Sequence, residues 1–151
     1  MTGRENPRDN DLFFTCSLIE YIARKTKNHR SDVVNALGFS CVEKIYELAD
    51  VYHSDNIDRV SEDFIAEAGI QEGNFDNVAA GEYSIPSHWD IGKVYKRLIL
   101  GIAKEKNMGI IEALMEGYHS FVSELIDDYN SSFYYDNPQN ILNAYLYGEV
   151  E

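Results

Sequence analysis

One helix face of this chain carries residue types that can bind a metal ion. Glu116 and His119 form a Glu-x-x-His motif, and Glu112 precedes it by one helical turn. Metal-binding helical bundles place carboxylates and imidazoles on one helix face in this way, and they use the motif twice. The chain has no second copy, and Asp50 with His53 is only a loose analogue. A helical metalloprotein is therefore an alternative, and we expect a solvated face with no metal or other cofactor.

Other patterns that carry chemistry are missing from the sequence. It has no glycine-rich phosphate loop, no Cys-x-x-Cys pair and no recognisable Ser-His-Asp or Cys-His arrangement. Single serine, histidine and aspartate residues indicate nothing about catalysis without geometry. We therefore predict that the protein is not an enzyme.

Residues 33–52 have the pattern of a helix-turn-helix. A short helix, a stop at Gly38 and a second capped helix follow one another. A helix that reads DNA needs cations and amides to meet phosphates and base edges. The second helix has three carboxylates against one cation, Lys44, so a polyanion would repel it. A DNA-binding regulator stays an alternative because basic residues cluster at 24–30 and 93–106.

Charge is sorted into blocks along the chain. The net charge is -13, and eleven carboxylates accompany a single cation, Arg59, between Ile45 and Gly92. No lysine or arginine follows Gly109. Contiguous negative surface of this kind repels phosphate and attracts basic partners. We predict that one run of carboxylates, the acidic face, docks a basic protein, with a merely solvated surface as the alternative: Glu47, Asp50, Asp55, Asp58, Glu62, Asp63 and Glu67.

Three adjacent aromatic residues, Phe133, Tyr134 and Tyr135, stand among polar residues in a predicted loop. They cannot all face one core. Tyrosine and phenylalanine are enriched at the centres of interfaces, so an exposed member is a candidate partner anchor. Packing of the last helix onto the body is the alternative explanation.

Helices must position these groups, because apolar residues recur at helical spacing through nearly the whole chain. Gly69 marks one helix end, Ser87 with Asp90 forms a capping box, and Asn137 precedes Pro138 at a helix start. The apolar stripes predict helices near residues 12–23, 31–37, 40–52, 57–68, 87–102, 111–129 and 137–146.

These helices predict an all-α fold, a compact bundle of six to seven helices in a single domain, residues 1–151. Residues 70–86 are rich in Gly, Asn, Asp, Ser and Pro, which predicts an irregular connection. It divides the chain into possible sub-halves at 9–69 and 87–151.

The sequence also predicts where the protein works. The first residues are polar and contain no signal peptide, and no run approaches the roughly 20 apolar residues of a membrane span. Cys16 and Cys41 stand in apolar helical patterns, which indicates reduced, buried thiols. We expect a cytoplasmic protein that binds no membrane, and its oligomeric state stays open.

Several short groups of residues between positions 14 and 65 carry a resemblance to a known family: Ile19-Glu20-Tyr21, Asp32-Val33-Val34 with Leu37-Gly38, Ile45-Tyr46 with Tyr52-His53, and Asp63-Phe64-Ile65. In these groups the chain resembles a small helical bacterial family of unknown function. Members are often encoded beside an ADP-ribosyltransferase-like protein, in an arrangement like that of toxin and antitoxin. The resemblance implies a non-enzymatic partner protein and assigns no functional residue.

Charge and resemblance together predict an acidic protein-interaction module. It would act as an antitoxin-like neutraliser or inhibitor of a bacterial or phage conflict-system protein, with a basic toxin or nuclease-like partner and no direct contact with nucleic acid. A nucleic-acid mimic that blocks a nuclease, such as a CRISPR effector, is the nearest alternative.

Overall fold

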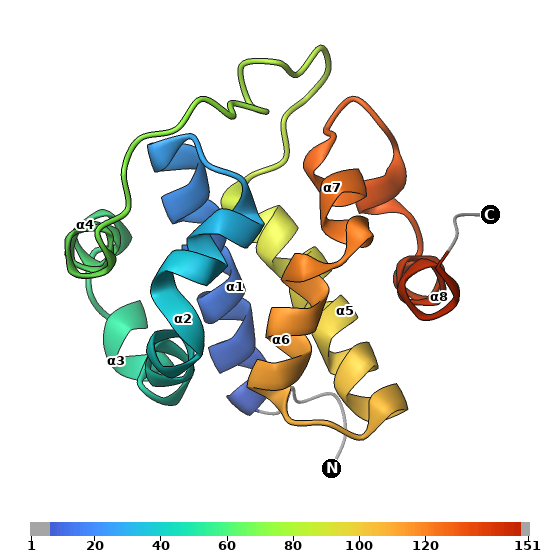
Figure 1. Ribbon diagram of the computed structural model, residues 1–151, viewed down its shortest axis with the longest axis horizontal. Coiled ribbons are helices and arrows are strands. Elements are labelled where there is room, and N and C mark those ends of the chain that lie inside the picture. Colours follow the sequence, from blue (N-terminus) through green and yellow to red (C-terminus); the bar gives the residue numbers. More distant parts are fainter. Residues whose placement is uncertain (1–6, 149–151) are drawn as a thin grey trace.

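Helix α1 (Pro7–Thr26) runs through the middle of the computed structural model, which describes residues 7–148 (Figure 1). It packs most extensively on α5 (His88–Lys106) and next on α2 (Arg30–Glu47). Because helices cover α1 from more than one side, Leu12 and Leu18 on different parts of its circumference are both at most 1% exposed. α1 is therefore the element around which the other helices are arranged.

The remaining helices of the first half form one side of the molecule. α2 is bent at Gly38, where φ is +81°, a backbone conformation that favours glycine. The short α3 (Ala49–His53) follows, and α4 (Ile57–Ala68) begins at Asn56, whose side chain accepts two backbone N–H groups. Gly69 ends α4 in the left-handed conformation, which confirms the helix end predicted there.

Residues 70–87 form no helix or strand, which confirms the irregular connection. In Figure 1 this segment crosses the top of the molecule between α4 and α5. The backbone N–H of Gly73 donates a 2.8 Å hydrogen bond to the carbonyl of Thr26 at the end of α1. The rings of His29 and Phe75 stack with centroids 3.8 Å apart. The connection is therefore fastened to the junction between α1 and α2.

The second half begins with α5, whose N-terminus has the predicted capping box between Ser87 and Asp90. The single helix predicted over 111–129 is wrong, because the chain forms α6 (Ile110–His119) and α7 (Phe121–Asp127) instead. Ser120 separates them with an extended backbone, ψ 162°. Its hydroxyl donates 2.8 Å to the carbonyl of Gly117. Such local side-chain bonds compete with the backbone hydrogen bonds of a helix, and the spacing of apolar residues does not reveal them.

The 3-10 helix η1 (Phe133–Tyr135) and helix α8 (Pro138–Tyr147) complete the described chain. Asn137 caps α8, and Pro138 takes its first position as predicted. Residues 7–148 thus contain eight α-helices, and the all-α fold class is confirmed. The number exceeds the prediction of six to seven because the helices predicted at 40–52 and 111–129 are broken, at Leu48 and Ser120, while α2 joins the helix predicted at 31–37 to the first part of the one predicted at 40–52.

One hydrophobic core contains residues of both possible sub-halves. α1 and α5 approach closely where Gly92 lies against Ser17, since an added Cβ at Gly92 would come within 2.9 Å of the Ser17 backbone. Tyr95 of α5 stacks on Tyr118 of α6 with ring centroids 4.0 Å apart. Cys16 is buried in this core, whereas Cys41 is only half-buried. None of the helices in residues 7–148 has the length and apolar character to cross a bilayer.

Candidate functional site

The acidic face lies at the α3–α4 end of the molecule (Figure 1). Its first carboxylate ends α2, the next two belong to α3 and the α3–α4 connection, and the other four stand on α4. All seven side chains are exposed. The apolar residues of α4 point the other way, since Val60 and Phe64 are each 3% exposed. The fold therefore gathers the seven predicted carboxylates at one end of the molecule.

Cations from α1 neutralise part of the acidic face. Lys25 Nζ lies 2.5 Å from Asp58 Oδ1 and 2.7 Å from Glu62 Oε1, and the hydroxyl of Tyr21 donates to Asp58 at 2.9 Å. The hydrogen bond from Lys25 is the main reason that the pKa of Asp58 lies below its usual value. Arg8 pairs with Glu47 at 3.4 Å.

Four carboxylates of the acidic face stay without a cation. Within residues 7–148, no ion pair involves Asp50, Asp55, Asp63 or Glu67. Their negative charge is therefore free to act on a partner.

The aromatic residues of η1 do not form one exposed cluster. Phe133 and Tyr134 are half-buried and pack against the core. Tyr134 also meets Tyr129 edge-to-face, with ring centroids 5.7 Å apart. Tyr135 is 68% exposed. Packing of the chain before α8 thus accounts for two of the three residues, and only Tyr135 is free to anchor a partner.

The acidic face and η1 lie at opposite ends of the molecule. Figure 1 places α3 and α4 at one end of the longest axis and α8, which packs with η1, at the other. One partner surface cannot use both unless it wraps around the whole domain. The structure therefore separates two groups of residues that the sequence analysis assigned to one interface.

Two apolar side chains are exposed beside the acidic face. Leu48 is 41% exposed and Val51 is 58% exposed. Leu48 lies between α2 and α3, and Val51 follows Asp50 within α3. They are exposed apolar side chains among the carboxylates of this face.

The carboxylate and imidazole of the Glu-x-x-His motif face separate protein partners. Glu116 accepts hydrogen bonds from Lys106 and from the hydroxyl of Tyr145, and these bonds lower its pKa. The two ring nitrogens of His119 lie 2.6 Å from the carbonyl of Met115 and 2.7 Å from Oδ1 of Asn35. Residues 7–148 contain no group of three or more side chains placed to hold a metal ion. The geometry does not favour the metalloprotein alternative.

The helix-turn-helix pattern is a bend within α2 at Gly38. After the bend, Val42, Ile45 and Tyr46 are buried, so the exposed side of this helix carries Glu43, Lys44 and Glu47. Carboxylates on the side that would meet DNA oppose binding to a polyanion.

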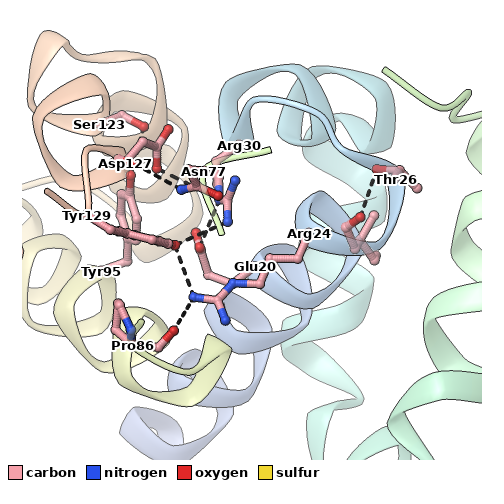
Figure 2. Close-up of polar contacts among 11 residues, drawn as sticks. Glu20, Arg24, Thr26, Arg30, Asn77, Pro86, Tyr95, Ser123, Asp127 and Tyr129 are labelled. Carbon is pink, nitrogen blue, oxygen red and sulfur yellow. Dashed lines mark hydrogen bonds and ion pairs between the residues drawn. The ribbon is translucent and has the colours of Figure 1, made fainter. Parts of the chain in front are cut away.

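A buried charge network forms the polar centre of the molecule (Figure 2). Arg30 Nε donates a 2.9 Å hydrogen bond to Glu20 Oε1, and both side chains are fully buried. Arg30 Nε also lies 3.8 Å from Asp127 Oδ1. The hydroxyl of Tyr129 accepts from Arg30 at 3.2 Å and from Arg24 at 3.1 Å. The network joins α1, α2 and α7 with Tyr129, which stands two positions after α7.

Burial changes how these groups titrate. Burial by itself would lower the pKa of Arg30, but the Glu20 carboxylate beside it raises that pKa above its ordinary value. Burial and then the charge of Glu20 raise the pKa of Asp127 to about 7, although Arg30 acts in the opposite direction. Oδ1 of Asp127 and one oxygen of Glu20 have no hydrogen-bond partner. Within this network we therefore expect Asp127 to change charge near neutral pH.

A cavity of about 550 Å³ reaches the network at Asp127 and Tyr129. His29 and Phe75 form part of its wall, and Asn77 donates a 3.0 Å hydrogen bond to the backbone carbonyl of Asp127. An aspartate with a near-neutral pKa beside a cavity can hold or release a proton there. The buried pair joins α1 to α2, and Asp127 and Tyr129 contact it from the second half of the chain, so we interpret the network as a clamp between helices.

Comparisons of the chain with protein-family models, curated proteins and solved structures find no match. The resemblance of residues 14–65 to a helical bacterial family stays a prediction. The proposed function therefore rests on the geometry and charge of residues 7–148.

The buried network was not predicted from the sequence, although the residue pattern contained a signal for it. Glu20 follows Cys16 by four residues on the apolar side of α1. Arg30 stands three, four and seven residues before the buried Val33, Val34 and Leu37. Each of these two helices has a charged residue at a position of its apolar stripe, and the two charges have opposite signs. This pattern indicates a buried ion pair.

Proposed function

We propose that this protein is an acidic interaction module that binds a basic protein and blocks it, in the manner of an antitoxin or inhibitor of a bacterial or phage conflict-system protein. The observation that carries the proposal is the acidic face, where seven exposed carboxylates share one end of the molecule and four have no cation. The family resemblance of residues 14–65 points the same way.

The acidic face would act first on encounter. Unpaired surface charge of one sign speeds association with an oppositely charged partner and weakens with salt. The exposed Leu48 and Val51 would then supply the apolar contact that slows dissociation. In this arrangement Leu48 and Val51 form the apolar anchor beside the charged residues, and Tyr135 does not contact the partner.

A nucleic-acid mimic is the second candidate. On α4 Asp63 and Glu67 are four positions apart, so they repeat negative charge once per helical turn along one side of the helix, whereas Asp58 and Glu62 are paired with Lys25. A row of this kind could occupy the nucleic-acid cleft of a nuclease, including a CRISPR effector. Competition between this protein and nucleic acid for one target separates the two candidates.

The proposal is tested with two variants of equal net charge. The face variant carries Asp50→Asn, Asp55→Asn, Asp63→Asn and Glu67→Gln. The control variant carries four substitutions at exposed carboxylates outside the face: Glu72→Gln, Glu82→Gln, Glu105→Gln and Glu112→Gln. A basic protein that co-purifies with the wild type from its native host is then produced alone, and its association rate is measured at low and high salt.

We expect the face variant to associate at least about tenfold more slowly at low salt and the control to stay within about twofold of wild type. Association rates that are insensitive to salt, or equal losses in both variants, would show that the acidic face is not the docking site.

A further inference from the structure

A groove of about 530 Å³ lies where α5 meets η1 and the start of α8. Lys93 and Arg97 of α5 line one side, and Tyr134 and Tyr135 of η1 line another. Its volume falls within the range of pockets that hold small molecules. The groove is far from the acidic face, which lies at the α4 end of the molecule (Figure 1).

The groove holds two cations that the protein leaves unpaired. Lys93 and Arg97 are exposed and stand four residues apart, one helical turn, on the same side of α5. Neither makes an ion pair or hydrogen bond with any residue in the described range 7–148. In a chain with 26 acidic and thirteen basic residues, two neighbouring cations without carboxylate partners form a local site for an anion.

The carboxylates that line the groove are already engaged by the chain itself. Asp90 Oδ2 accepts the backbone N–H of Ser87 at 2.8 Å in the capping box. Asp136 Oδ1 accepts the backbone N–H of Asn137 at 2.7 Å and the side-chain amide of Asn140 at 3.1 Å. These bonds hold both carboxylates at helix starts. They do not pair with Lys93 or Arg97.

The rest of the groove favours a flat apolar group. Val94, Leu98 and Ile141 line it, and Tyr135 is 68% exposed beside them. Nucleobases stack on exposed tyrosine rings, and arginine and lysine bind phosphate. A ligand that fills this groove therefore combines an aromatic ring with a negatively charged group.

We propose that this groove binds a mononucleotide, with its base against Tyr135 and its phosphate between Lys93 and Arg97. A small ligand fits better than a nucleic-acid strand, because the net charge of -13 repels a polyanion over the rest of the surface. This inference does not depend on the proposed function, since it uses another part of the molecule.

The test is isothermal titration calorimetry of the full chain with adenosine monophosphate, adenosine and inorganic phosphate as separate probes. We expect saturable binding of the monophosphate and at least about tenfold weaker binding of each of the other two, because each lacks one half of the contacts. No saturable binding of the monophosphate at about 1 mM would overturn the proposal. Phosphate that binds as tightly as the monophosphate would show that the aromatic half is wrong.

Two pairs of variants locate the site. Lys93→Gln with Arg97→Gln should weaken binding of the monophosphate at least about tenfold. Lys44→Gln with Lys104→Gln, which removes two exposed lysines elsewhere, should leave that binding within about twofold of wild type.

The aromatic half of the site is tested with two tyrosine variants. Tyr135→Ala should weaken binding of the monophosphate at least about fivefold, whereas Tyr147→Ala, which removes a similarly exposed ring, should not weaken it. All substituted side chains are exposed, so circular dichroism should show native helix content in each variant. Equal losses within either pair would overturn the assignment of the site.

Discussion

Arg30 Nε and Glu20 Oε1 form a 2.9 Å hydrogen bond in which both side chains are completely buried. The pair joins the start of α2 to the middle of α1, and Asp127 of α7 and Tyr129 meet it from the second half of the chain. Oppositely charged groups that are taken out of water together must stay together, because each alone is strongly disfavoured in the interior.

Arg30→Met should destabilise the protein by about 3 to 5 kcal/mol, because it leaves the buried Glu20 without its counter-charge. Urea unfolding followed by circular dichroism measures this loss. Arg59→Met, which removes an exposed arginine, serves as the control and should change stability by no more than about 0.5 kcal/mol. A loss below about 1 kcal/mol for Arg30→Met would contradict a buried ionic clamp.

Asp127 should make stability fall as pH rises through the neutral range. Its pKa is raised from 3.8 to about 7 in the folded protein, so the native state binds the proton more tightly than the unfolded state. Below pH 3.8 both states are protonated at this group, and its contribution is constant. Between the two pKa values its contribution falls with rising pH, and above about 7 the full penalty of the buried charge applies.

Asp127→Asn removes this titration. The free energy of unfolding of the variant relative to wild type should therefore rise between pH 4 and pH 8, by up to about 4 kcal/mol. Urea titrations at a series of pH values measure the difference. Parallel stability curves for the two proteins would show that Asp127 titrates normally.

Gly92→Ala should destabilise the packing of α1 on α5. An added Cβ would lie 2.1 Å from the hydroxyl of Ser17 and 2.9 Å from its backbone, and backbone atoms cannot move aside cheaply. Overpacking of this kind typically costs about 1 to 3 kcal/mol. Gly117→Ala is the matched control, since its new methyl group would be 3.5 Å or more from its neighbours and should be neutral or stabilising. Thermal melts of both variants distinguish these outcomes, and equal melting temperatures would refute the close approach.

Lys25→Gln should have a small, salt-dependent effect on stability. Its ion pairs with Asp58 and Glu62 lie at an exposed surface, where water and ions screen them. The melting temperature should fall slightly at low salt and match wild type at about 0.5 M salt. The same variant frees two carboxylates, so association with a basic partner should become faster. A slower association would show that the basic partner binds a surface other than the acidic face.

Sequence patterns predicted three of the helix ends correctly because the interactions behind these ends are local. The capping box at Ser87, the caps at Asn137 and the left-handed end at Gly69 each depend on residues within a few positions of one another. The break at Ser120 was missed because the apolar stripe continues through it, while the backbone does not. The exposure of the acidic face also followed from residue type and spacing alone.

An all-helical chain, an irregular connection at 70–86 and segregated charge could be predicted from residue order, since helical periodicity and net charge belong to the chain before it folds. Which groups meet depends on how the chain packs. The tertiary structure pairs Arg30 with Glu20 in the interior, brings Lys25 onto the acidic face, and places that face at the opposite end of the molecule from α8, on which η1 packs. The physical reason is that these relationships depend on how whole helices pack. Contacts such as the one between Arg30 and Tyr129 join residues 99 positions apart, and no local pattern encodes them.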